Sequence, residues 1–200
     1  MELNNADLGE PTDLELVSRA QAGEARAFDF LVLRYQKRLY SVIYQITRHH
    51  QDTEDVLYET LIKAHGNLKG FKGNSGFHTW LYRIAVNRSL NFIRLRKTNR
   101  EISIHSGDEE GEGFDIPDEG IVNEVEQQEN RSELQKKLNE SLARLSEDHR
   151  TVVNLFDIQG LSHSEISKIL GCSEGTVRSR LHYAHKLLQS YLKDAKKGDR

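Results

Sequence analysis

Apolar residues recur at helical spacing through most of the first hundred residues of the chain. Thr12 and Glu15 form a capping-box pattern, which predicts that a first helix begins at about Asp13. Between Phe28 and Ile46, apolar residues follow one another at steps of three, four and one, and these steps trace a single helical stripe. The beginning of the chain therefore predicts two helices that bury one face each.

Two further helices are predicted on either side of a glycine-punctuated loop. The first covers about 51–65, with Leu57, Leu61 and Ala64 towards the core. The loop covers 66–76 and contains four glycines, so it favours irregular backbone. The second helix begins near His78 and ends at about Lys97. Its predicted buried side carries Leu81, Ile84, Ala85, Phe92 and Leu95.

Helical periodicity stops at about residue 98 and resumes after residue 130. The intervening segment has four glycines, one proline and many acids, so we expect a mobile or irregular linker. Beyond it, Leu134, Leu138, Leu142 and Leu145 predict one helix, and Ser146 predicts the N-cap of the next. The expected fold is all-α, with helical domains at 13–97 and 131–193 joined by an acidic linker at 98–130.

The segment LSHSEISKILGCSEGTVRSRLHYAHKLL has the pattern of a helix-turn-helix. Ser162 and Glu165 form a capping box, Gly171 permits a tight turn, and Ser173 predicts the N-cap of the second helix. The inward residues of that helix are Val177, Leu181, Ala184, Leu188 and Tyr191. Its other side offers hydrogen-bonding and cationic groups, as in a helix that reads DNA: Arg178, Ser179, His182 and Lys186. The alternative is a plain helical hairpin without DNA contacts.

Composition agrees with helices and excludes several classes of protein. Two prolines in 200 residues argue against a β-sandwich, a barrel or a collagen-like chain. No apolar run approaches the roughly 20 residues that span a bilayer, and the acidic, polar N-terminus does not resemble a signal peptide. A single cysteine forms no internal disulfide, which suits a reducing compartment, so we expect a cytoplasmic protein without membrane insertion.

The net charge of −3 conceals a strong asymmetry along the chain. Residues 105–130 contain ten Asp or Glu and no Lys or Arg, whereas residues 60–100 contain nine Lys or Arg and no acid. A long basic stretch points to a polyanionic partner. The alternative is a solvated basic face with no partner.

Aromatic residues are interleaved with the basic ones. Phe71, Phe77, Trp80, Tyr82 and Phe92 all lie in the acid-free stretch. Exposed rings beside positive charge suit single-stranded DNA, because unpaired bases stack on them. Phe71 and Phe77 fall in the loop and are the better candidates for contact, whereas Trp80 and Phe92 are equally compatible with core burial.

Features of an enzyme are weak in this sequence. Cys172, His182 and His185 could suggest a metal site, but their spacing fits no usual zinc pattern. The chain has no Walker-type phosphate loop and no nucleophile elbow. We therefore expect neither catalytic residues nor a metal or other cofactor.

Three segments together resemble the extracytoplasmic-function (ECF) class of bacterial sigma-70 factors. ELVSRAQAGEARAFDFLVLRYQKRLY is similar to the start of the sigma-2 domain, and DTEDVLYETLIKAHGNLKGFKGNSGFHTWLYRIAVNRSLNFIR to the rest of it. LARLSEDHRTVVNLFDIQGLSHSEISKILGCSEGTVRSRLHYAHKLL is similar to the sigma-4 domain. The resemblance implies a non-enzymatic factor that binds core RNA polymerase, directs it to promoters and assists DNA melting. The alternative is a helix-turn-helix regulator that works without polymerase.

The resemblance also implies roles for particular residues. Docking on the clamp of the largest polymerase subunit falls to Asp52, Glu54, Asp55 and Glu59. Recognition of the −10 element falls to Phe71, Lys72, Asn74, Ser75, Phe77, Trp80, Arg83, Asn87 and Arg88. Recognition of the −35 element falls to Ser173, Thr176, Arg178, Ser179, Arg180, His182 and Lys186. Other implied partners are the flap of the second-largest subunit, promoter DNA and an anti-sigma factor.

The chain departs from the family pattern at several of these helices. Tyr58 stands where glutamine is common, and Leu61 where an aromatic residue is common. In the predicted recognition helix, Tyr183 and His185 occupy positions where arginine is common.

Overall fold

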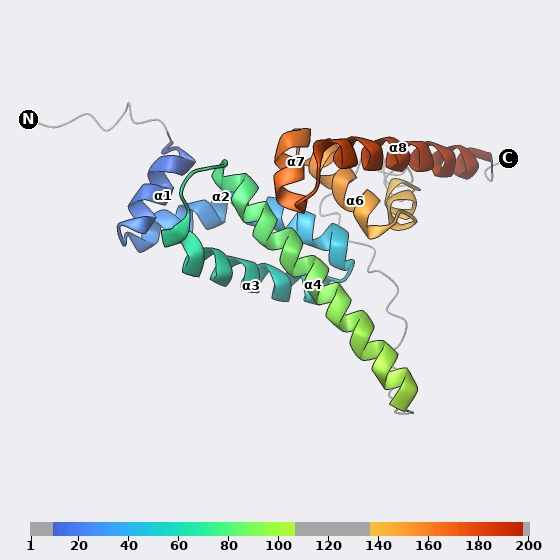
Figure 1. Ribbon diagram of the computed structural model, residues 1–200, viewed down its shortest axis with the longest axis horizontal. Coiled ribbons are helices and arrows are strands. Elements are labelled where there is room, and N and C mark those ends of the chain that lie inside the picture. The colour runs from blue at the N-terminus through green and yellow to red at the C-terminus, as the bar shows by residue number, and fades with distance from the viewer. Residues whose placement is uncertain (1–9, 107–136, 198–200) are drawn as a thin grey trace, which may run out of the picture.

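A computed structural model describes residues 10–106 and 137–197 of the chain. Within these two ranges the chain forms helices, turns and loops, and no strand. The first lobe consists of α1 (Asp13–Gln21), α2 (Ala25–Thr47), α3 (His50–Asn67), the short 3-10 turn η1 (Leu68–Gly70) and α4 (Phe77–Ser106). Figure 1 shows α4 running as a long rod beside α2 and α3.

The first lobe forms as its apolar pattern predicts. The backbone N–H of Thr12 donates to the Glu15 carboxylate (2.7 Å), and the N–H of Glu15 donates to Oγ1 of Thr12 (3.3 Å), so the capping box is confirmed. The predicted stripe of α2 is buried at Leu31, Tyr35, Leu39, Val42, Ile43 and Ile46. These side chains make α2 the centre of the lobe, against which α1, α3 and α4 pack.

The second lobe begins with helical residues 137–143. It continues through α6 (Glu147–Val153), the π-helical turn η2 (Asn154–Ile158), α7 (His163–Leu170) and α8 (Glu174–Lys197). The predicted N-cap of α6 is confirmed, because Oγ of Ser146 accepts the His149 N–H. Leu138 and Leu142 lie in this helix as predicted, Leu145 instead lies in the bend that follows it, and Leu134 lies outside the described residues.

The helix-turn-helix is confirmed in its geometry. The N–H of Ser162 donates to Glu165 at 2.9 Å, and Gly171 ends α7 with a φ of 65°. This left-handed backbone favours glycine. Val177, Leu181 and Ala184 are buried on the inner side of α8.

The predicted end of α4 at Lys97 is wrong. The helix continues to Ser106, so residues 98–106 are helical rather than an irregular start of the linker. The physical reason is composition, because neither glycine nor proline interrupts the chain between Gly76 and Gly107. The rest of the predicted linker, 107–130, lies outside the described residues, as do residues 131–136 of the predicted second domain.

The two lobes pack against each other. Helix α7 lies on α4, and α6 lies on α2 (Figure 1). The buried apolar residues of both lobes form one continuous cluster. Polar links cross the same boundary: Nε2 of His78 lies 2.7 Å from Oε1 of Glu165, and the Tyr82 hydroxyl lies 3.4 Å from Oε1 of Gln159. A salt bridge between Lys97 and Glu147 adds a further link.

Candidate nucleic-acid interface

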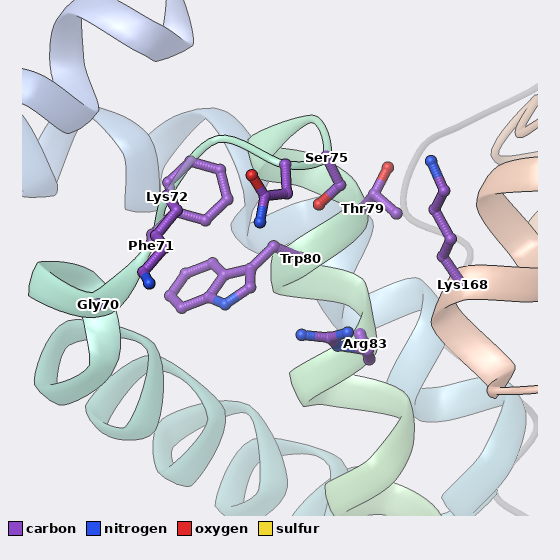
Figure 2. A pocket seen from close by; sticks show the side chains of 9 residues that line it. Gly70, Phe71, Lys72, Ser75, Thr79, Trp80, Arg83 and Lys168 are labelled. Atoms are coloured by element: carbon purple, nitrogen blue, oxygen red, sulfur yellow. The ribbon is translucent and has the colours of Figure 1, made fainter.

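A cavity of about 290 Å³ opens between the loop before α4 and the first turns of that helix (Figure 2). Its lining combines aromatic rings, cations and small polar groups, and it contains no carboxylate. The lining residues are Gly70, Phe71, Lys72, Asn74, Ser75, Thr79, Trp80, Arg83 and Lys168. Such a lining suits a planar, negatively charged ligand.

The wall of the pocket is built by the loop and by α1. The N–H of Phe71 donates to the carbonyl oxygen of Leu68 at 3.0 Å, which closes the 3-10 turn. Nε2 of Gln21 donates to the carbonyl oxygens of both Leu68 and Phe71, each at 2.9 Å. These bonds fix the backbone that carries the Phe71 ring. Gly73 then turns the loop with a φ of 72°.

The aromatic rings form a contiguous cluster under the pocket. The centroids of Phe71 and Trp80 lie 5.2 Å apart, and those of Phe77 and Trp80 lie 5.6 Å apart. Phe77 also lies 5.7 Å from Tyr35 of α2. Phe71 and Trp80 are half-buried and line the cavity. Their rings are accessible from the cavity, and both pack against Phe77 on the other side.

The prediction that Phe77 offers an accessible ring is wrong. Its side chain is only 4% exposed, because Phe77 is the first residue of α4 and points into the core between Tyr35 and Trp80. Phe77 therefore supports Trp80 and does not line the pocket. Phe92 is half-buried and packs against the core of the lobe, whereas Leu95, predicted on the same buried side, is 65% exposed.

The structure brings six of the predicted −10 residues together around the cavity. They are Phe71, Lys72, Asn74, Ser75, Trp80 and Arg83. Asn87 lies one helical turn beyond Arg83 and is exposed. Arg88 instead forms a salt bridge with Glu59 of α3.

Three lining residues were missed by sequence reasoning. Gly70 and Thr79 have backbone or short side chains that carry no sequence signal for a ligand. Lys168 comes from α7 in the second lobe, 85 or more positions further along the chain than the rest of the pocket. Nothing in the local sequence pattern indicates that α7 packs on α4, so only the three-dimensional structure could find Lys168.

The predicted docking face on α3 is divided into paired and free acids. Asp52 forms a salt bridge with Arg96, and Glu59 forms one with Arg88, so both are tied to α4. Glu54 and Asp55 are exposed, and no ion pair of either is present in the described part of the chain. Two exposed apolar side chains lie on the same helix, Tyr58 (69% exposed) and Ile62 (54% exposed).

The recognition side of α8 is open to solvent. Oγ of Ser173 accepts the Thr176 N–H at 3.1 Å and so caps the helix. The outward residues Arg178, Ser179, His182 and Lys186 are exposed, whereas Arg180 is half-buried and lies 2.6 Å from Asp148 of α6. Arg178 also pairs with Glu174 at 3.1 Å, within the first turns of α8.

Glu165 is the most perturbed carboxyl group near the pocket. Burial raises its pKa, but hydrogen bonds from Ser162 and from His78 outweigh burial and lower the pKa to about 2. The group is therefore an anion at neutral pH. As an anion it caps α7 and binds α4 at the same time.

The described ranges contain no cluster of His, Cys, Asp or Glu placed to hold a metal ion. His185, one of the residues weighed for such a site, instead lies 2.7 Å from Asp157. Among the helices of residues 10–106 and 137–197, none is long and apolar enough to cross a membrane.

Two family models match the chain in the order in which the lobes occur. The model "Sigma-70 region 2" matches residues 31–100, and the model "Sigma-70, region 4" matches residues 135–188. The RNA polymerase sigma-H factor of Pseudomonas aeruginosa is 35% identical, with 94% of this chain and 100% of that one covered. The ECF RNA polymerase sigma-E factor of Haemophilus influenzae is 35% identical over 90% of this chain and 94% of that one.

Solved structures give the same result at the level of the fold. CnrH, in complex with the cytosolic domain of CnrY, matches with a TM-score of 0.66 and 25% identity over 91% of this chain and 97% of that one. The sigma factor RpoE of Bartonella quintana, in complex with the anti-sigma factor NepR, matches with a TM-score of 0.65 and 26% identity over 84% of this chain and 98% of that one.

Regions 2 and 4 in succession define a class of proteins, the sigma factors of bacterial RNA polymerase. The chain belongs to the sigma-70 family, in its ECF class, whose members direct polymerase to specific promoters for transcription initiation.

Proposed function

We propose that this sigma factor uses three separate surfaces in initiation: α3 for the polymerase, the aromatic pocket for the −10 element, and α8 for the −35 element. The observation that carries the proposal is the pocket itself. Phe71 and Trp80 offer two rings, Lys72 and Arg83 offer positive charge, and no acid lines the cavity. An unpaired base with its phosphate has the matching chemistry.

Docking on the polymerase is supported by α3. Glu54 and Asp55 are exposed acids without intramolecular ion pairs among the described residues, so they can face a basic partner. Tyr58 and Ile62 add apolar area beside them. We assign this face to the clamp of the largest subunit, and we assign the second lobe to the flap of the second-largest subunit.

Promoter opening is assigned to the pocket. A base of the non-template strand leaves the duplex and stacks in the pocket, which offsets the few kcal/mol lost in unpairing it. The ring of Phe77 packs against Trp80 and is itself in contact with Tyr35, which supports Trp80 for this role. Arg83 and Asn87 follow on exposed positions of α4 and contact the adjacent strand.

Reading of the −35 element is assigned to α8. Its exposed residues Arg178, Ser179, His182 and Lys186 can reach base edges and phosphates when the helix lies in the major groove. Neither lobe alone needs high affinity, because polymerase holds both on one DNA molecule.

An anti-sigma factor is the expected regulator. The support comes from RpoE of Bartonella quintana, whose matched structure contains the anti-sigma factor NepR. We also expect the chain to act in the bacterial cytoplasm, where its polymerase works. The alternative of a regulator that works without polymerase is not favoured, since both sigma regions match.

The assignment of the pocket is tested with Trp80→Ala in reconstituted holoenzyme. Loss of a stacked base costs about 1–3 kcal/mol, so we expect open-complex formation to fall roughly fivefold to 150-fold. Permanganate reactivity of unpaired thymines in the −10 region measures opening. Trp80→Phe, which keeps an aromatic ring, should retain most of the promoter opening.

The matched control is Leu95→Ala, which truncates an exposed side chain on the same helix outside the pocket. It should open promoters as the unchanged protein does. Circular dichroism and core binding confirm that each variant is folded. Equal promoter opening by Trp80→Ala and Leu95→Ala would contradict the assignment.

A further inference from the structure

We propose that the pocket also binds a free nucleoside monophosphate while the two lobes are packed together, and that Lys168 of α7 completes this site. The proposal rests on the proposed function in one respect, because it gives a second occupant to the pocket assigned to the −10 base. The mononucleotide site differs from the proposed −10 site because it requires Lys168, a residue of the second lobe.

The charges around the cavity support an anionic ligand. Three cations line it, Lys72, Arg83 and Lys168, and none of them has a carboxylate partner in the described part of the chain. Farther along α4, Arg88, Arg96 and Lys97 are each paired with an acid, and among the described residues only Arg94 of that stretch has no ion pair. The Glu165 carboxylate, 3.5 Å from Oγ1 of Thr79, offsets one of the three charges, and the remaining positive charge attracts an anion to the pocket.

Lys168 is placed at the pocket by a specific contact between the lobes. Glu165 receives hydrogen bonds from His78 Nε2 at 2.7 Å and from Thr79 Oγ1 at 3.5 Å, which hold α7 on the first turn of α4. Lys168 follows Glu165 by three residues and so shares its helix face. Figure 2 shows Lys168 beside Thr79, on the opposite side of the cavity from Lys72.

The size and lining of the cavity indicate a single nucleotide. A volume of about 290 Å³ lies just below the usual range of small-molecule sites, so it suits a single nucleotide better than a dinucleotide. The base would stack against Phe71 and Trp80, and the phosphate would lie towards Arg83 and Lys168, on the side of the cavity away from Lys72. Asn74, Ser75 and Thr79 supply neutral hydrogen-bonding groups around it.

The consequence is a coupling between nucleotide binding and lobe packing. A nucleotide that contacts Lys168 binds only the packed form, so it stabilises that form by mass action. By reciprocity, separation of the lobes on polymerase and promoter DNA weakens nucleotide binding by the same factor. Free nucleotide would then oppose holoenzyme formation.

Trp80 allows a direct measurement, since it is the single tryptophan of the chain. The full-length protein is titrated with AMP, GMP, CMP and UMP, and Trp80 fluorescence is followed. We expect saturable quenching by at least one of them. Adenosine and guanosine, which lack phosphate, and inorganic phosphate, which lacks a base, should bind at least tenfold more weakly.

Lys168→Gln is the decisive variant. It should weaken mononucleotide binding at least tenfold, whereas Lys37→Gln, an exposed lysine of α2 outside the pocket, should leave binding unchanged. Lys37→Gln should also leave promoter opening in holoenzyme unchanged, so it is the control for both readouts.

The outcomes separate this inference from the proposed function. No quenching by any mononucleotide, equal quenching by inorganic phosphate, or unchanged affinity in Lys168→Gln would overturn the inference and leave promoter opening untouched. Mononucleotide binding that depends on Lys168, together with normal promoter opening by Trp80→Ala, would support the inference and overturn the assignment of the −10 pocket.

Discussion

Glu165 connects local folding with the packing of the lobes. Its carboxylate accepts the backbone N–H of Ser162 as part of the capping box, and it also binds His78 of the first lobe. Only the first role is readable from the sequence, because a capping box is a local pattern. The contact with His78 joins residues 87 positions apart and depends on the packing of the lobes. The same side chain thus begins α7 and positions it on α4.

Glu165→Gln tests both roles through stability. Loss of the charged cap should lower the free energy of unfolding by about 1 kcal/mol at pH 6. The pKa of Glu165 in the folded protein, about 2, is below its ordinary value of 4.5. Its stabilising contribution is therefore complete above pH 4.5 and is lost as the pH falls towards 2. Urea unfolding at pH 6 and at pH 3 measures the difference between the two proteins.

The control for this experiment is Glu140→Gln, which changes an exposed glutamate that precedes α6. Its free energy of unfolding should equal that of the unchanged protein at both pH values. If the difference in free energy of unfolding between Glu165→Gln and the unchanged protein stays constant from pH 6 to pH 3, the carboxylate is not the stabilising group.

Gly171 is required for its backbone conformation rather than for space. A Cβ added there would meet nothing within 4 Å, but the φ of 65° is strained for any residue with a side chain. We expect Gly171→Ala to destabilise the protein by about 1 kcal/mol. Gly175→Ala is the matched control, because Gly175 lies inside α8 at ordinary helical φ and its added Cβ would make only a normal contact.

Thermal unfolding of both glycine variants measures this difference. Gly175→Ala should be neutral or stabilising by up to about 1 kcal/mol, since alanine favours helix over glycine. Equal melting temperatures for the two variants would mean that the turn does not depend on the left-handed backbone.

Among the helices, α3 carries two acids that pair with α4 and two that are exposed. Asp52 and Glu59 form salt bridges with α4, whereas Glu54 and Asp55 are exposed without such partners among the described residues. The sequence predicted one acidic docking face and gave no sign of this division. The reason is that Arg88 and Arg96 lie far along the chain and reach α3 only through helix packing.

Asp55→Asn should therefore weaken binding to core polymerase more than Asp52→Asn does. We expect the dissociation constant to rise about tenfold for Asp55→Asn, as for loss of a charged contact of about 1.4 kcal/mol. Asp29→Asn, at an exposed acid of α2, is the control and should bind as the unchanged protein does. Fluorescence anisotropy with labelled protein and core polymerase measures all three, and a larger effect from Asp52→Asn would contradict the division.

Local patterns predicted the elements well, and contacts between distant elements were not predictable. The helix-turn-helix was readable because its cap, its turn glycine and its apolar spacing all lie between Ser162 and Leu188. Phe77 was misplaced because a loop position suggested exposure, whereas its ring packs against Tyr35 of α2. Lys168 was missed for the same reason, since pockets between lobes depend on tertiary packing.

In the molecule as a whole, the packed arrangement does not fit the proposed reading of both promoter elements at once. The −10 and −35 elements lie about 25 base pairs apart, or about 85 Å at 3.4 Å per base pair. Lys168 of α7 lines the pocket assigned to the −10 element, and Lys186 of α8 follows it by 18 residues across one turn, or roughly 27 Å at 1.5 Å per residue. The lobes must therefore separate before both elements are bound.

The boundary between the lobes contains groups that make separation feasible. Arg150 of α6 is 9% exposed and lies near enough to Arg48 for the two like charges to interact. Burial lowers the pKa of Arg150 to about 10, so the group is still a cation at neutral pH. The repulsion between buried Arg150 and half-buried Arg48 opposes the apolar contacts that hold the lobes together.

We expect this chain to direct core RNA polymerase to promoters through both lobes. The most direct test is run-off transcription with purified core polymerase, this protein and a library of genomic promoter fragments. We predict transcripts that depend on the protein and whose templates share an upstream and a downstream element at constant spacing. Absence of such transcripts, despite a complex of the protein with core polymerase on gel filtration, would contradict the account.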